Sequence, residues 1–140
     1  MTNTCEGGTL IPVDGGAFVA ASNRESVWRF DFANGLSVES LAAWRVTEQR
    51  GLLTYLLIGS LDVQDSALAS RHLEKIFAGK ELKVLCFEPD RLLISMQDVE
   101  EMLRLELLCL SVSEENWRII GEDFVDSDKN RLLTSRQGLT

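Results

Sequence analysis

The chain has few of the residue types that stabilise small secreted proteins or carry out catalysis. Its 140 residues include two prolines, three cysteines and one histidine. The odd number of cysteines, without a CxxC pair or metal-ligand spacing, argues against a secreted disulfide framework. Cys86 and Cys109 lie in apolar runs, where we expect buried thiols. Residues 1–8 have neither the basic nor the apolar segment of a secretory signal, and no apolar run reaches the roughly 18 residues of a membrane-spanning helix, so we expect a cytoplasmic protein.

Basic side chains are also scarce, since 14 lysines and arginines face 22 acidic residues and the net charge is −8. The imbalance is local, because residues 81–128 hold 13 of the acidic side chains and 4 of the basic ones. Nucleic-acid binding needs basic side chains that displace counterions from phosphates, and an acidic field repels an anionic membrane surface. We therefore expect neither of these partners, whereas the field favours a basic protein.

Motifs for catalysis and cofactor binding are missing from the sequence. It contains no GxSxG nucleophile motif, no Walker A loop and no GxGxxG fingerprint. The single histidine, His72, falls in the middle of a predicted helix, where a surface position is more common than a role as a base. Pairs of adjacent acids are frequent, but neighbours on a strand point to opposite faces. The sequence predicts no enzyme, no catalytic residue, no metal and no cofactor.

The most frequent pattern in the sequence is an alternation of apolar and polar residues, which is typical of β-strands. Segments 28–32 and 36–40 alternate in this way around Asn-Gly. A three-residue loop with left-handed Gly35 pairs Phe30 with Val38, whereas a two-residue turn would pair core residues with solvent-facing ones. The sequence therefore predicts a hairpin with the longer loop.

A second hairpin and a buried strand are predicted further along. Residues 82–87 and 92–96 flank a turn at Pro89-Asp90, with Leu85 opposite Ile94. Residues 52–58 are apolar on both faces, which predicts a central strand covered on one side by a helix. Shorter strands are expected near 17–21, 43–47, 103–109 and 116–120.

One strong helix is predicted over residues 66–78. Asp65 is a suitable N-cap, and Gly79 is placed as the left-handed residue that ends the helix. The apolar stripe of this helix consists of Ala69, Leu73, Ile76 and Phe77.

These elements predict an α+β fold, with a mainly antiparallel sheet of about seven to nine strands around one main helix. The expected organisation is a flexible lead-in over 1–15, a single domain over 16–121 and an acidic, polar tail over 122–140. The three tryptophans, Trp28, Trp44 and Trp117, are expected to pack in the core.

The order of these features resembles a bacterial family. It runs from Trp28-Arg-Phe-Asp-Phe-Ala-Asn-Gly-Leu-Ser-Val through Trp44-Arg45 and the helix ending at Gly79 to Glu115-Asn-Trp117. Over about residues 16–121 this order resembles small uncharacterised bacterial domains, some of which lie beside toxin genes and are regarded as immunity proteins. The resemblance rests on core aromatics and turn glycines, so it implies a fold family and transfers no functional residue.

Three functions follow as hypotheses. The first is a non-enzymatic protein-binding domain, such as an immunity-type inhibitor, whose acidic C-terminal half covers a basic partner. The residues expected to bind that partner are Glu100, Glu101, Glu114, Glu115, Glu122 and Asp123. The second is a self-associating structural domain, because the apolar runs 52–58 and 105–110 exceed what one small sheet covers and a homodimer would bury the rest. The third is an enzyme or small-ligand carrier with a pocket between helix and sheet.

Overall fold

The computed structural model describes residues 9–110 and 115–121, which form a nine-stranded antiparallel sheet and one α-helix. The strands are β1 (Thr9–Arg24), β2 (Val27–Phe32), β3 (Ser37–Ser40), β4 (Ala43–Arg50), β5 (Leu53–Gly59), β6 (Glu81–Glu88), β7 (Arg91–Gln97), β8 (Met102–Leu108) and β9 (Trp117–Ile120). A short 3-10 helix, η1 (Ser60–Asp62), and the α-helix α1 (Ser66–Ile76) follow β5. The mainly antiparallel sheet with one main helix is confirmed for these residues.

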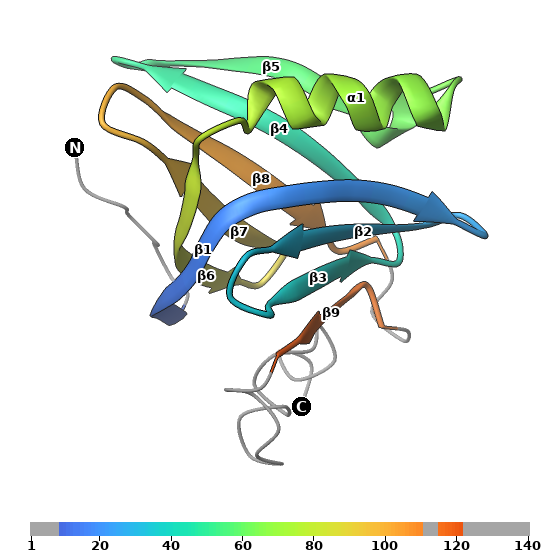
Figure 1. Cartoon of the computed structure of the whole chain (residues 1–140), viewed down its shortest axis with the longest axis horizontal. Helices are drawn as coiled ribbons and strands as arrows, with labels where there is room; N and C mark the ends of the chain where they lie inside the picture. The colour runs from blue at the N-terminus through green and yellow to red at the C-terminus, as the bar shows by residue number, and fades with distance from the viewer. Residues whose placement is uncertain (1–8, 111–114, 122–140) are drawn as a thin grey trace.

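The strand order makes the sheet curl. It runs β5-β4-β8-β7-β6-β1-β2-β3-β9, so β3 and β4 stand near opposite ends. Yet only Leu41 and Ala42 join the two strands, and so short a link spans about 10 Å. Figure 1 shows the chain passing directly from β3 into β4. The two ends of the sheet therefore face each other across one core.

An aromatic cluster between β2 and β4 fills that core. The ring centroid of Trp44 lies 5.1 Å from that of Trp28 and 5.6 Å from that of Phe30, both edge to face. All three side chains are buried, and Trp117 of β9 belongs to the same core. The expectation that the three tryptophans pack inside is therefore confirmed.

Strand β1 bends at a glycine pair and thereby serves both ends of the sheet. Its first part pairs with β6 and its second part with β2. A Cβ atom on Gly15 would lie 3.0 Å from the Cβ of Leu82, and Gly16 has φ +76°. The prediction of a flexible lead-in is therefore wrong for residues 9–15, because the glycines allow a bend within a paired strand. Residues 1–8 and the predicted tail over 122–140 lie outside the described residues.

Both predicted hairpins have the predicted register. Phe30 pairs with Val38 across a loop in which Gly35 has φ +80°. Leu85 pairs with Ile94 across the turn at Pro89-Asp90. Local alternation of apolar residues was sufficient to choose these registers.

Helix α1 packs on β1, with Ala69 and Leu73 of its predicted apolar stripe buried. The carboxylate of Asp65 accepts a hydrogen bond from the backbone N–H of Leu68 at 3.1 Å, which caps the first turn. Phe77 is fully buried, and its ring centroid lies 5.1 Å from that of Phe18 on β1. Gly79 has φ +76°, as expected of the residue that ends the helix. Within the described residues, no helix combines the length and apolar character needed to cross a membrane.

The apolar run 52–58 occupies a different position from the predicted one. It forms β5, which lies at one edge of the sheet, so the prediction of a central, helix-covered strand is wrong. The other side of β4 is taken by β8, and α1 packs mainly on β1. Apolar residues on both faces therefore remain exposed instead of being buried.

The cysteines differ from expectation at one position. Cys86 is buried, as expected, but it is disulfide-bonded, so the prediction of a free thiol at this position is wrong. The odd number of cysteines did not exclude a single disulfide bond. Cys109 keeps its thiol, and its Sγ accepts a hydrogen bond from Asn116 Nδ2 at 3.2 Å.

We predict that Trp44→Ala lowers the free energy of unfolding by about 3–5 kcal/mol, because it leaves a cavity between the two ends of the sheet. Urea unfolding followed by far-ultraviolet circular dichroism measures the change. Val99→Ala is the matched control, since Val99 is fully exposed and its truncation should cost less than about 0.5 kcal/mol. A loss below about 1 kcal/mol for Trp44→Ala would contradict this role of the cluster.

Candidate interaction surface

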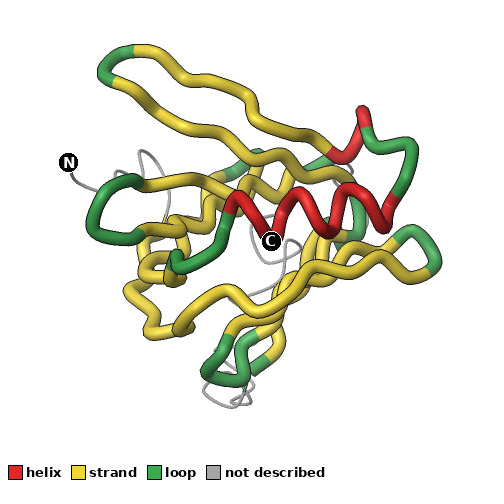
Figure 2. Tube along the Cα trace, turned by 45° about the horizontal axis from the view of Figure 1, so that its top comes forward, coloured by secondary structure: helices red, strands yellow, loops and turns green. Residues whose placement is uncertain are grey.

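Five of the twelve large apolar side chains that are exposed in the described residues lie on the β4–β5 hairpin. Leu52 is 100% exposed, Leu53 60%, Leu56 58%, Tyr55 42% and Leu57 37%. Figure 2 shows this hairpin extending beyond the body of the molecule. Exposed apolar side chains gathered on one hairpin of a folded domain are typical of an interaction site.

The hairpin projects because only the C-terminal end of β5 packs against the core. Ile58 pairs with Val46, and both pack into the core, whereas a bulge follows between Val46 and Thr47. From there to the turn, every β5 residue is exposed. The two-residue turn begins with Gly51 at φ +61°, a conformation that suits glycine in a tight hairpin.

A salt bridge and an aromatic contact stabilise the end of the hairpin. Arg50 Nη2 lies 2.8 Å from Glu48 Oε1. The guanidinium of Arg50 also lies over the ring of Tyr55, 5.1 Å from its centroid. The salt bridge lies within β4, whereas the contact of Arg50 with Tyr55 joins β4 to β5 where the core no longer supports them.

An open groove of about 650 Å³ lies between Ile58 at the end of β5, the segment that links η1 to α1, and α1 itself. Its lining includes the apolar residues Ile58, Val63 and Leu68 and charged side chains of both signs from η1 and α1. His72 also lines the groove and is exposed, which agrees with its predicted surface position. In the described part of the chain, no cluster of three or more acidic, histidine or cysteine side chains could hold a metal ion.

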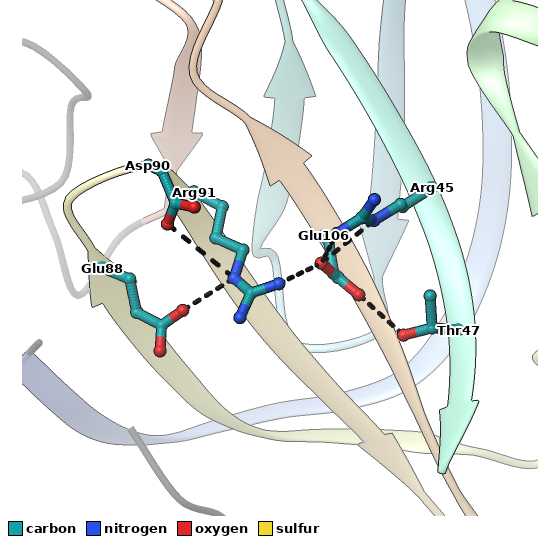
Figure 3. A network of polar contacts seen from close by, with 6 residues as sticks. All are labelled: Arg45, Thr47, Glu88, Asp90, Arg91 and Glu106. Carbon is teal, nitrogen blue, oxygen red and sulfur yellow. Dashed lines mark hydrogen bonds and ion pairs between the residues drawn. The ribbon is translucent and has the colours of Figure 1, made fainter. Parts of the chain in front are cut away.

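A buried carboxylate, that of Glu106, forms hydrogen bonds with the face of β4 that points away from the aromatic cluster. The two oxygens of Glu106 on β8 accept hydrogen bonds from three side chains, as Figure 3 shows. Arg45 Nη2 and Arg91 Nη1 donate to Oε1 at 3.0 and 2.8 Å, and the hydroxyl of Thr47 donates to Oε2 at 2.7 Å. Arg91 also pairs with Glu88 at 2.7 Å. The network therefore joins β4, β8, β7 and β6 on one face of the sheet.

The network keeps Glu106 ionised. Burial alone raises the pKa of this carboxyl, but the hydrogen bonds from Thr47 and Arg45 and the charges of Arg45 and Arg91 outweigh burial and lower the pKa below its ordinary value of 4.5. A buried carboxylate with two arginine partners is a structural group here, because its oxygens are occupied by the chain itself.

The predicted acidic surface is only partly assembled. Glu101 forms an ion pair with the buried Lys80 at 2.7 Å, and Glu115 forms one with Arg118 at 2.6 Å. Glu100 lies exposed in the β7–β8 turn and forms no ion pair with any described residue. The remaining predicted residues, Glu114, Glu122 and Asp123, lie outside the described residues.

Two of the three placed acids are thus held by cations of their own chain, so an acidic surface for a basic partner stays a prediction. Sequence reasoning assigned surplus apolar surface of the 52–58 run to a homodimer, but it predicted a central strand there and missed the exposed edge position of β5. Residues 51–61 contain no charged side chain, and a buried strand and an exposed binding strand share that pattern.

We predict that the protein loses stability as the pH falls below about 4.5, because Glu106, Asp31, Asp98 and Glu101 all have lowered pKa values. A carboxyl group with a lower pKa in the folded than in the unfolded state stabilises the fold above its unfolded pKa. It loses that contribution as the pH falls through its folded pKa. Glu106→Gln should lower the unfolding free energy by about 1–3 kcal/mol at pH 7 and flatten the decline with acid.

Urea unfolding between about pH 7 and pH 3 measures both effects. Glu100→Gln is the control, since Glu100 is exposed and its variant should follow the parent curve. Parallel pH curves for Glu106→Gln and the parent protein would contradict the assignment.

Comparison with protein-family models, with curated protein sequences and with solved structures found no match for this chain. The resemblance to bacterial immunity domains therefore stays a prediction. The case for a function rests on the geometry of the β4–β5 hairpin.

Proposed function

We propose that this chain is a protein-binding domain that takes up an additional strand along β5. The observation that carries the proposal is an edge strand of seven residues, Leu53–Gly59, with exposed apolar side chains and no charge. An edge strand presents unpaired backbone N–H and C=O groups to any extended segment that approaches it. Strand addition uses these groups for affinity and the alternating side chains for selectivity.

The other edge of the sheet supports this reading by contrast. Strand β9 has four residues, and its Arg118 is held between Glu39 and Glu115. Short length and charged side chains are the usual protection of an edge against unwanted pairing. Strand β5 has neither protection, although the same chain shows both at β9. The difference favours β5 as a surface for binding.

The side chains of β5 also limit which residues a partner segment can contain. A segment that pairs with Leu53–Gly59 meets leucine, isoleucine, threonine and tyrosine side chains and no charge. Burial of a charged side chain against them would cost free energy without compensation. The partner is therefore an extended segment rich in apolar and β-branched residues.

A peptide-display selection on the immobilised protein tests this proposal. The enriched peptides should be uncharged and rich in apolar residues, and their binding should perturb the amide NMR signals of residues 53–59. Leu56→Lys should weaken their binding at least about tenfold, because it places a charge in the middle of the edge. Val99→Lys, which adds the same charge at an exposed position far from β5 in the sequence, should leave binding unchanged. Equal binding to the parent and Leu56→Lys would contradict strand addition at β5.

A further inference from the structure

We infer that the strand added to β5 is β5 of a second copy, so that two chains form an antiparallel dimer with a two-fold axis near Leu56. This inference rests on the proposed function and names its partner. It requires that β5 match itself when reversed, because the same surface contributes both sides of a two-fold interface.

The side chains of β5 meet this requirement. With the axis at Leu56, the antiparallel arrangement places Leu56 opposite itself and Tyr55 opposite Leu57 of the second chain. Each of these residues is at least 37% exposed in the single chain. Apolar and aromatic cross-strand pairs are among the favourable ones, at about 0.2–1 kcal/mol each.

The ends of the strand match in the same arrangement. Leu52 precedes β5, Leu61 follows it, and both are largely exposed at 100% and 82%. They stand four and five positions from Leu56, so the reversed second chain brings Leu52 of one copy close to Leu61 of the other. A parallel arrangement would separate these two leucines by the length of the strand.

The nearest charges are complementary as well. Arg50 lies across from Leu53, is 67% exposed at its side chain and reaches over Tyr55. Asp62 is exposed and follows the far end of β5 in η1. Because the second chain runs in the opposite direction, its Asp62 comes to the end of the strand where Arg50 lies. Attraction at both ends favours a second copy over an arbitrary segment.

The net charge of −8 does not oppose this contact. No acidic side chain lies between Arg50 and Asp62 in the sequence, and Glu48, which pairs with Arg50, is buried. Two copies that meet along β5 therefore bring no carboxylates directly opposite each other across the paired strands.

Sedimentation equilibrium of the whole chain from about 1 to 300 µM tests the inference, since a dimer depends on protomer concentration. The mass of the parent protein should rise from 15.7 kDa toward twice that value. Leu56→Lys places two lysines opposite each other at the axis and should weaken dimerisation at least about tenfold. Val99→Lys should dimerise like the parent protein. Thermal unfolding confirms that each variant is folded.

A charge exchange tests the antiparallel direction. Arg50→Glu and Asp62→Lys should each weaken dimerisation by about three- to tenfold, and the double variant should recover most of the loss. A parent protein that stays at 15.7 kDa throughout, a Leu56→Lys variant that dimerises normally, or a double variant that is weaker than both single ones would each overturn the inference. If the parent protein is monomeric but still binds selected peptides along β5, the dimer fails while strand addition stands.

Discussion

The contact of Trp44 with Trp28 and Phe30 joins the two ends of one long sheet, and the other features of the structure depend on it. These rings bring β4 against β2, although several strands separate them in the strand order. The two-residue link after β3 makes the approach necessary, and the bend of β1 at Gly15 and Gly16 makes it sterically feasible. A single core then serves both ends, with α1 covering β1.

The position of β4 in that core explains the candidate surface. Its inner face is held by the aromatic cluster, and its outer face by hydrogen bonds of Arg45 and Thr47 to Glu106. A strand fixed on both faces and paired with β8 is a firm support for a projecting hairpin. Strand β5 is supported by its pairing with β4, but its residues from Leu53 to Leu57 lie outside the core. Pairing with β4 holds the exposed edge in an extended conformation, and an edge ordered in this way would lose less entropy on strand addition as proposed.

Charge has a different role in this protein from the one its composition suggests. Glu106, Glu101 and Glu115 each bind cations of the same chain, and these contacts connect strands and turns. The lowered pKa values of Glu106 and Glu101 reflect that internal pairing. The excess of acid is thus partly structural, and the surface that we propose for a partner is the one without charge.

Local patterns in the sequence determined the strands, both hairpin registers and the helix with its Asp65 cap, because alternation and turn residues act over a few neighbouring positions. They also indicated a core position for Trp44. The place of β5 was decided only by tertiary structure. A strand that is apolar on both faces is predicted to favour burial, but the pattern does not show whether its own sheet, a helix or another chain covers it. That choice depended on the pairing of β4 with β8 and the packing of α1 on β1, contacts between residues far apart in the sequence.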